Sequence, residues 1–348
     1  PRTPAVRTIT LIVLVPLLAA LALWAFAWPN ARTAPRDLPL GVAGPATATA
    51  QLEKQLRQHE GAFEIHRYDD EAAARDAIED RTVYGAVVAT PEGPELLTAS
   101  AAGPFVAQLL QQAVAQQAAG QGRPMKTVDV VAAPAADPRG SALSASVLPL
   151  ALAGLAAGAA VTLLGLRGVT AVVTLTGAAI LVGIVGAALA HSWLGVITGD
   201  WWAEAGVLAL STLAASAATA GLGALIGTAG IGVVSLVVML FGNPFSGASS
   251  APRMLPEPVG TIGQWLPPGA GATLLRSVSF FDGAAATGPA LTLTWWAALG
   301  LGAVLIGSAL NYRTRAAVRH GGPPLERSRE WGSACRASRR RGDPSEGP

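Results

Sequence analysis

Few side chains in this sequence combine a reactive type with a spacing that could support chemistry. His191, Asp200 and Glu204 come closest, because an imidazole and two carboxylates in one short stretch could bind a metal ion or transfer protons. Trp201 and Trp202 lie beside them and favour a simpler interpretation, in which these residues mark a membrane boundary. A membrane enzyme is therefore the weakest of three functional hypotheses.

The other candidate ligands are scattered. His59 and His66 fall in different predicted elements, at a spacing that favours no metal. Asp69, Asp70 and Glu71 could attract a cation, but acidic residues in this position are typical of the start of a helix. The sequence has no G-x-x-x-x-G-K-[ST] phosphate loop, so we do not expect this chain to bind ATP in that manner. We predict no catalytic, metal or cofactor site.

The composition instead indicates a membrane protein. Of the 348 residues, 51% are hydrophobic and only 13% are charged, about half the charged share of soluble domains. The net charge of +2 comes from arginines beside apolar stretches rather than from a basic face, so nucleic acid is not an expected partner. Abundant Ala, Gly and Pro point to a bacterial source. The single cysteine, Cys335, excludes an intrachain disulfide, so any domain outside the membrane must be held by its own core.

Five stretches contain no Asp, Glu, Lys or Arg and are long enough to cross a hydrocarbon core of about 30 Å. They are residues 9–28, 144–166, 168–190, 205–242 and 290–310. The fourth stretch is too long for one helix and is predicted to form two short helices that turn in the Gly221–Gly232 cluster, which gives six spans. A signal peptide is the alternative for the first stretch, since Ala25-Phe26-Ala27 resembles a cleavage site.

The distribution of arginine predicts the orientation. Arg2 and Arg7 precede the first span, and nine arginines follow the last, so both termini are expected in the cytoplasm of a multi-pass protein of the bacterial plasma membrane. Arg167 falls on the same side, whereas Arg253 and Arg276 in the last outer loop do not follow the rule. The chain begins without Met, which allows for further residues upstream.

Residues 30–142 have the composition of a soluble domain, with ten basic and fourteen acidic residues. Their pattern alternates between strands and helices. The predicted strands are 38–43, 63–68, 84–90, 95–100 and 127–132, and the predicted helices are 46–59, 70–80 and 103–119. The expected fold class is a membrane all-α bundle of six transmembrane helices with an inserted extracytoplasmic α/β domain. The expected parts are 1–29 (cytoplasmic N-terminus and first span), 30–142 (outer domain), 143–311 (five-helix bundle) and 312–348 (disordered Arg-rich cytoplasmic tail).

The last outer loop, residues 243–289, is apolar yet repeatedly broken by proline, which removes backbone donors that a lipid-facing helix needs. We predict a re-entrant or interfacial cap on the bundle, with residues 271–281 as a short flat helix. A rigid closing loop and a functional gate both fit this pattern. The candidate cap or gate residues are Asn243, Pro244, Ser246, Gly247, Pro256, Pro267, Pro268, Gly269 and Arg276.

This order of parts, with a broken G-N-P-x-S-G…L-P…L-P-P-G loop before the last span, resembles the permeases of the type-2 ABC transporter class. Within that class it is most similar to the phage infection protein (YhgE/Pip) branch of bacterial membrane proteins. The resemblance implies half of a homodimeric or heterodimeric exporter, surrounded by membrane lipids and powered by a separate ATPase subunit. The loop from Asn243 to Gly269 would then cap the outer end of the path.

One feature departs from that class. Its permeases usually present a coupling helix to the ATPase between the second and third spans, whereas Leu166-Arg167-Gly168 leaves almost no connection here. The N-terminal segment and the tail after Asn311 are the remaining candidates for ATPase contact.

Two functional hypotheses therefore lead. The first is an exporter subunit for a hydrophobic or amphipathic compound, because charge-free spans argue against a proton- or ion-coupled carrier. The second is a non-transporting surface receptor or scaffold that uses the outer domain, which the missing coupling helix favours.

Overall fold

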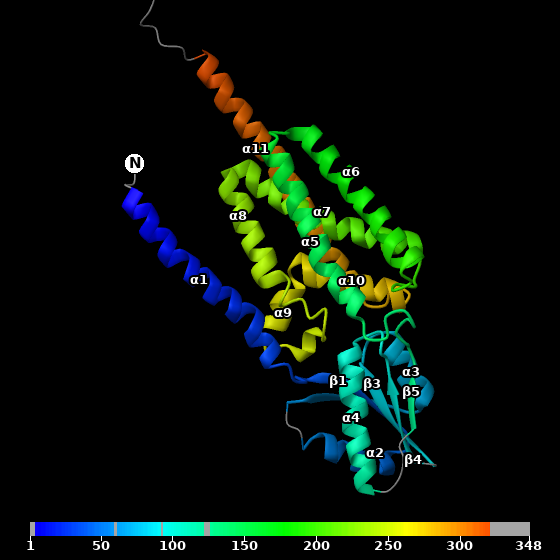
Figure 1. Cartoon of the computed structure of the whole chain (residues 1–348). Coiled ribbons are helices and arrows are strands. Elements are labelled where there is room, and N and C mark those ends of the chain that lie inside the picture. The colour runs from blue at the N-terminus through cyan, green and yellow to red at the C-terminus, as the bar shows by residue number, and fades with distance from the viewer. Residues whose placement is uncertain (1–3, 59–60, 92, 122–125, 321–348) are drawn as a thin grey trace, which may run out of the picture.

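The computed structural model describes residues 4–58, 61–91, 93–121 and 126–320, and shows an α/β domain at one end of a helical assembly (Figure 1). We call this end of the helices the domain end and the other the opposite end. The first helix, α1 (Pro4–Ala31), leads into the domain, and α5 (Ser141–Leu163) leads out of it.

The α/β domain contains a five-stranded mixed sheet in the order β2-β1-β3-β4-β5. Its strands are β1 (Leu38–Ala43), β2 (Phe63–Tyr68), β3 (Gly85–Thr90), β4 (Gly93–Thr98) and β5 (Lys126–Asp129). Its helices are α2 (Ala46–Leu56), α3 (Glu71–Glu79) and α4 (Pro104–Gln121). Only the β3–β4 pair is antiparallel. The predicted bounds of β1 and β2 are confirmed, and the other elements differ from prediction by a few residues at their ends.

Successive side chains of each strand face opposite sides of the sheet and build two separate cores. Val87 and Leu96 lie on one side with residues from α4, whereas Val88 and Leu97 lie on the other with residues from α3.

The start of helix α3 is fixed by a capping residue. Asp70 is its N-cap, and its Oδ1 accepts a hydrogen bond of 2.8 Å from the Ala73 N–H.

The remaining helices form the bundle. They are α6 (Gly168–Ala187) with a π-helical end at Ala188–Trp193, α7 (Trp201–Ile226), α8 (Thr228–Leu236) with a π-helical continuation at Val237–Gly242, and α11 (Thr287–His320). Five helices in the described part of the chain, α1, α5, α6, α7 and α11, are long and apolar enough to cross a membrane. The chain is therefore that of a multi-pass membrane protein.

The sixth predicted span is shorter than the others. The predicted turn in the glycine cluster is present at Gly227, whose φ of 69° suits glycine. After it come nine residues of α8 and six of π-helix, which rise about 22 Å and fall short of a hydrocarbon core of about 30 Å. The first half is longer than expected, because α7 already begins at Trp201 in the predicted outer connection.

The last helix also differs from expectation. A disordered tail was expected from residue 312, but α11 continues to His320 and projects beyond the bundle at the opposite end (Figure 1). The rest of the predicted tail, including Cys335, lies outside the described residues.

Helix α7 lies at the centre of the bundle, and small residues let its neighbours approach closely. A Cβ atom on Gly158 of α5 would lie 2.4 Å from the Ser216 carbonyl oxygen of α7, and one on Gly154 would lie 2.7 Å from the Ala215 Cβ. These glycines therefore pack within one bundle.

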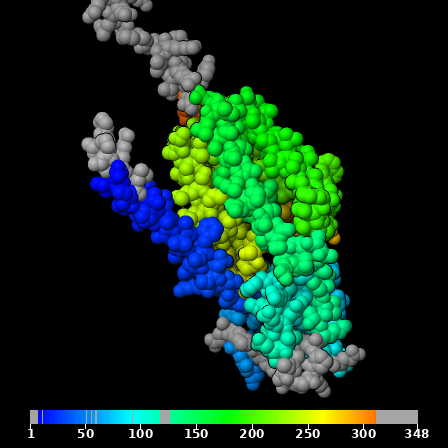
Figure 2. Space-filling model, in the orientation of Figure 1, coloured from blue at the N-terminus to red at the C-terminus, as the bar shows by residue number. Residues whose placement is uncertain are grey.

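Helix α1 is packed differently. It diverges from the other helices (Figure 2), and its main contact is the packing of Ala25 against Leu240 and Phe245.

Candidate functional site at the domain end

Residues 243–289, which we call the cap segment, lie between the helices and the α/β domain (Figure 1). The segment contains a 3-10 turn at Pro252–Met254, α9 (Val259–Gln264) and α10 (Pro267–Phe280). The predicted helix 271–281 begins four residues earlier than expected. Pro267 and Pro268 fit its first turn, where no backbone donor is required.

The segment begins with a compact turn formed by three of the predicted residues. The Ser246 hydroxyl donates to the Asn243 carbonyl at 2.7 Å and accepts from the Ala248 N–H at 3.2 Å. Gly247 has a φ of 65°, and a Cβ there would lie 2.7 Å from the Pro252 nitrogen. Both the backbone conformation and the packing therefore require glycine at this position. Pro244 lies inside the turn, which is the G-N-P-x-S-G motif of the sequence.

Hydrogen bonds then join the turn to both cap helices. The Gln264 side chain donates to the Ser246 carbonyl at 2.9 Å and accepts from the Thr273 hydroxyl at 2.6 Å. The Pro256 carbonyl accepts from the Val259 N–H at 2.8 Å at the start of α9. Gly269 packs so closely on α9 that a Cβ would lie 2.1 Å from the Gly263 carbonyl oxygen. The parts of the cap segment are thus held to one another by hydrogen bonds and close packing.

Beneath α10 lies a narrow apolar cavity between α5 and α7. Its volume is about 30 Å³, room for only one or two water molecules. Pro267 and Pro268 line it together with Gly271, Ser146 of α5 and Ser211 of α7. Pro267 and Pro268, two of the predicted cap residues, therefore line a cavity between two helices that is too small for any drug-sized solute.

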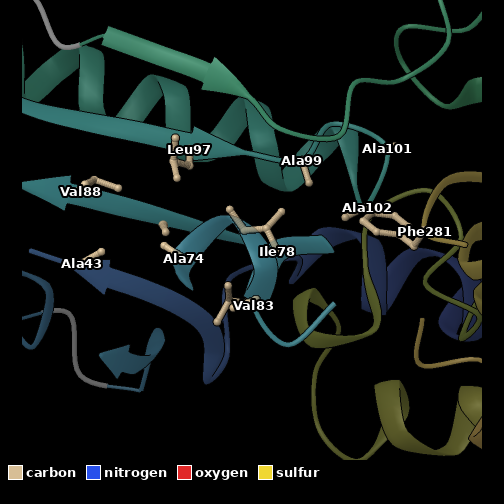
Figure 3. Close-up of a cluster of buried hydrophobic side chains, with 12 residues drawn as sticks. Ala43, Ala74, Ile78, Val83, Val88, Leu97, Ala99, Ala101, Ala102 and Phe281 are labelled. Carbon is tan, nitrogen blue, oxygen red and sulfur yellow. The ribbon is translucent and has the colours of Figure 1, made fainter. Parts of the chain in front are cut away.

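The cap segment also packs on both faces of the sheet. Ala251 and Met254 belong to the core that contains Val87 and Leu96, whereas Phe281 belongs to the opposite core. Figure 3 shows Phe281 entering that core beside Ala102. The α/β domain was expected to be held by its own core. Most residues of both cores do come from the domain, and residues more than a hundred positions later add to the core on each face.

Backbone contacts strengthen this joint. The N–H groups of Ala34 and Arg36 donate to the carbonyls of Met254 and Arg253, both at 3.1 Å, and the Arg36 guanidinium donates to the Met254 carbonyl at 2.8 Å. The segment that leads from α1 into β1 and the cap segment therefore lie side by side.

Arg276 is separated from the other cap residues. It faces the α/β domain rather than the cavity, is only 4% exposed, and donates to the Ala248 carbonyl at 3.0 Å. Burial, together with the nearby Arg81 guanidinium, lowers the pKa of Arg276 to about 10. Its place explains why it departed from the expected distribution of arginine: it is a packed interior residue rather than a topological signal.

Arg81, which also lies at this joint, was not among the residues singled out from the sequence. Its guanidinium reaches from the end of α3 to α10, where it donates to the Thr273 carbonyl at 3.2 Å and to the Ser277 hydroxyl. It also lies over the Phe281 ring, 5.3 Å from the centroid. The available signal was an arginine just after a predicted helix, at a position where glycine or asparagine usually ends one.

The residues considered for enzymatic chemistry are partly brought together. His191 Nδ1 lies 2.7 Å from Glu204 Oε2, and Glu204 is fully buried, with its other oxygen accepting from the Gly199 N–H at 2.8 Å. Asp200 does not join them: it is the N-cap of α7 and accepts from the Ala203 N–H at 2.8 Å. The contact between His191 and Glu204 therefore holds the α6–α7 connection in place.

The other candidate ligands have structural partners or fall outside the structure. Glu71 pairs with Arg75, and His66 lies 3.5 Å from Glu64 on the exposed strand β2. His59 lies outside the described residues. No group of three or more His, Cys, Asp or Glu in the described ranges is arranged to hold a metal ion.

The opposite end has a different character. The α5–α6 connection consists of residues 164–167, slightly longer than the connection at Arg167 that the sequence predicted, and the Gly168 N–H donates to the Ser308 hydroxyl of α11 at 2.7 Å. An open cleft of about 420 Å³ lies there, bordered by Arg167, Gly227 and Ser308. The described residues include no coupling helix between α5 and α6.

A comparison with known families bears on this architecture. Residues 6–147 match the family model described as ABC-2 family transporter protein. The matched stretch runs from α1 through the whole α/β domain to the start of α5, so the likeness includes the order of span and domain as well as apolar composition. It supports an ABC-type permease, a class that generally works with a separate ATPase subunit. Neither a curated protein nor a solved structure matches the chain.

Proposed function

We propose that this protein is the permease subunit of an ABC-type exporter for a hydrophobic or amphipathic compound, in the plasma membrane of a bacterium. The ABC-2 family match over residues 6–147 carries the proposal, together with five helices long enough to cross a membrane. Within that class we place it in the phage infection protein (YhgE/Pip) branch, on the resemblance of the Asn243–Gly269 loop. It acts as a homodimer or heterodimer.

The proposed orientation puts the α/β domain and the cap segment outside and both termini in the cytoplasm. Arg167 lies in the short connection at the opposite end, and Arg313, Arg315 and Arg319 lie in the part of α11 that projects there. Lysine and arginine beside spans favour the cytoplasmic face. The residues Asn243, Ser246, Gly247, Pro256 and Gly269 hold the cap in shape, and Pro267 and Pro268 close the path.

The proposed substrate class rests on a side cavity between α7, α8 and α11. Its volume is about 450 Å³, within the range of sites for small organic ligands, and its lining is predominantly apolar. Trp265, Trp295 and Trp296 border it, and their rings offer apolar faces with polar edges. This lining suits an amphipathic molecule that reaches the protein from the membrane.

The proposed ATPase contact is the projecting end of α11, residues 311–320. The four-residue α5–α6 connection is too short to present a helix to an ATPase, whereas α11 extends out of the bundle toward the proposed cytoplasm (Figure 1). Movement of α11 would reach the cap, because Trp296 donates to the Trp265 carbonyl at 2.8 Å.

The proposal is tested by purifying the protein from its native host after gentle cross-linking and identifying the attached chains by mass spectrometry. We expect a stoichiometric ATPase with a phosphate-binding loop, and we expect its recovery to fall when residues 311–320 are deleted. Recovery of no ATPase under conditions that retain other membrane complexes would overturn the exporter assignment.

The second candidate is a non-transporting surface receptor or scaffold, favoured by the short α5–α6 connection. Expressing residues 30–142 alone is not a sound test, because that fragment lacks Met254 and Phe281 of its cores. The full-length protein should be compared with and without ATPase. Binding of an envelope protein that does not depend on ATPase would favour the scaffold.

A further inference from the structure

Two arginines from different parts of the chain lie in the joint between the α/β domain and the cap segment, near enough for Arg81 to lower the pKa of Arg276. Arg81 comes from the end of α3, and Arg276 from α10. The hydrogen-bond acceptors of both guanidiniums are uncharged, namely the carbonyls of Ala248 and Thr273 and the hydroxyl of Ser277. Each guanidinium carries five N–H donors, so both have capacity for further acceptors.

Neither positive charge has a negative partner in the part of the chain that the structure describes. Among the residues that the structure describes, no carboxylate lies within 4.0 Å of either guanidinium. Tyr84 lies nearby, but burial raises the pKa of its phenol, so it stays neutral at pH 7. With its pKa at about 10, Arg276 stays protonated at pH 7. Buried charges are normally paired, and like charges at one site destabilise it.

The one acidic residue beside Arg276 is already engaged. Asp137 and Arg276 line the same small cavity, together with Ser100 and Phe280. Asp137 accepts from the Ser141 N–H at 2.8 Å, the Ser141 hydroxyl at 2.9 Å and the Ala142 N–H at 2.8 Å. It therefore caps the start of α5, and its position there leaves Arg276 without an ion pair.

The backbone of Arg81 is also held in an unfavourable conformation. Its φ of 59° lies in the left-handed region, which side chains larger than glycine rarely adopt. Such a residue persists only where its surroundings determine it, and such residues cluster at binding sites. Here the conformation accompanies the contact of the Arg81 guanidinium with α10.

We propose that Arg81 and Arg276 form a binding site for an oxyanion, a phosphate or carboxylate group carried by a solute or by a lipid headgroup. Guanidinium groups match the geometry of both anions and bind them through paired hydrogen bonds. The cavity at Arg276 has a volume of about 10 Å³ and admits only a water-sized group, so binding requires the domain and α10 to separate. This inference goes beyond the exporter proposal and does not depend on it.

The test measures thermal unfolding of the full-length protein in mild detergent, in sodium phosphate against sodium chloride of equal ionic strength. The same measurement is made in nanodiscs of phosphatidylglycerol or of phosphatidylcholine. Arg81→Met and Arg276→Met remove one charge each. Arg139→Met is the matched control, because Arg139 is exposed, lies near the same joint and forms no ion pair among the described residues.

We expect phosphate or phosphatidylglycerol to raise the Tm of the wild-type protein and of Arg139→Met by about 3 °C or more. Both joint variants should lose this rise. A loss seen with dissolved phosphate identifies a solute anion, and one seen only in phosphatidylglycerol nanodiscs identifies a headgroup. An equal rise in all four proteins would be a general salt effect and would overturn the proposal, as would no rise in the wild type. Arg81→Met, at a partly exposed position, keeps the test valid if Arg276→Met does not fold.

Discussion

The two ends of the helical bundle differ in how they are connected. At the domain end, the cap segment inserts residues into both cores of the sheet and carries a network of hydrogen bonds and the buried Arg276. The partly exposed Arg81 of the α/β domain and the buried Glu204 of α7 lie at the same end. At the opposite end, four residues join α5 to α6, a single glycine separates α7 from α8, and an open cleft lies between them.

This difference bears on how an ATPase at the opposite end could move the cap segment at the domain end. In this conformation the domain end is packed together, so a shift of α10 would either displace the sheet or open the joint between them. At the opposite end the last turns of α11 project beyond the bundle, and the start of α1 stands apart from the other helices (Figure 1). An ATPase acting there would move the cap through α11 rather than through a coupling helix.

The largest effect is expected from locking the cap to α7. A Cβ on Gly271 would lie 3.3 Å from the Ser211 Cβ, close to the spacing of about 3.5–4.5 Å in disulfides. Ser211→Cys with Gly271→Cys, in a Cys335→Ser background, should therefore form a cross-link under oxidation. We expect export to fall more than about tenfold and to recover on reduction. Each single-cysteine variant is the control, and undiminished export by the cross-linked protein would show that α10 is not a gate.

The next effect concerns the joint between cap and sheet. Phe281→Ala should destabilise the protein by about 3–5 kcal/mol, because it empties a packed position at the edge of the α3-side core. Phe105→Ala is the matched control, since Phe105 is 41% exposed on α4, and should cost much less. Both are measured by denaturant unfolding of the full-length protein. Similar losses for the two variants would contradict an interlocked domain end.

The His191–Glu204 pair provides a third test. His191→Ala leaves the fully buried Glu204 without its imidazole partner, which should cost about 1–3 kcal/mol. The double variant with Glu204→Gln should recover part of that loss, because an amide is less costly to bury than an unpaired carboxylate. Thermal unfolding of the single and double variants measures the coupling. Additive losses would mean that the two side chains do not interact.

The smallest effect compares two glycines with similar backbone conformation. Gly168 at the opposite end has a φ of 56° and open space around it, so Gly168→Ala should cost only the conformational strain, about 1–2 kcal/mol. Gly247 in the cap has a φ of 65° and contacts Pro252, so Gly247→Ala should cost more. Equal changes in Tm would show that the cap turn is as loosely packed as the opposite end.

Local features of the sequence predicted most of the fold. The alternation of apolar residues located β1 and β2 to the residue, and the charge-free stretches located the helices of the bundle. The turn at Gly227 and the short α5–α6 connection also followed from local composition. Each of these features depends on neighbours along the chain, which a single sequence records.

The features that were missed depend on contacts between distant segments. Nothing near Phe281 or Met254 signals that they enter the sheet cores, because their partners lie far away in the sequence. Arg276 resembled a topological signal until its burial was seen. The extension of α11 to His320 was missed because arginine-rich sequence, which favours the cytoplasm, also forms helices readily.

The interlocked cores also constrain the order in which the protein is synthesised. Phe281 leaves the ribosome roughly 150 residues after Asp129, the last residue of the sheet, a delay of about 8–30 s at ~5–20 residues per second. During that interval the sheet exposes apolar surface that Met254 and Phe281 later cover. Nascent chains stalled before residue 250 should therefore depend on holding factors, whereas chains extended beyond residue 290 should not.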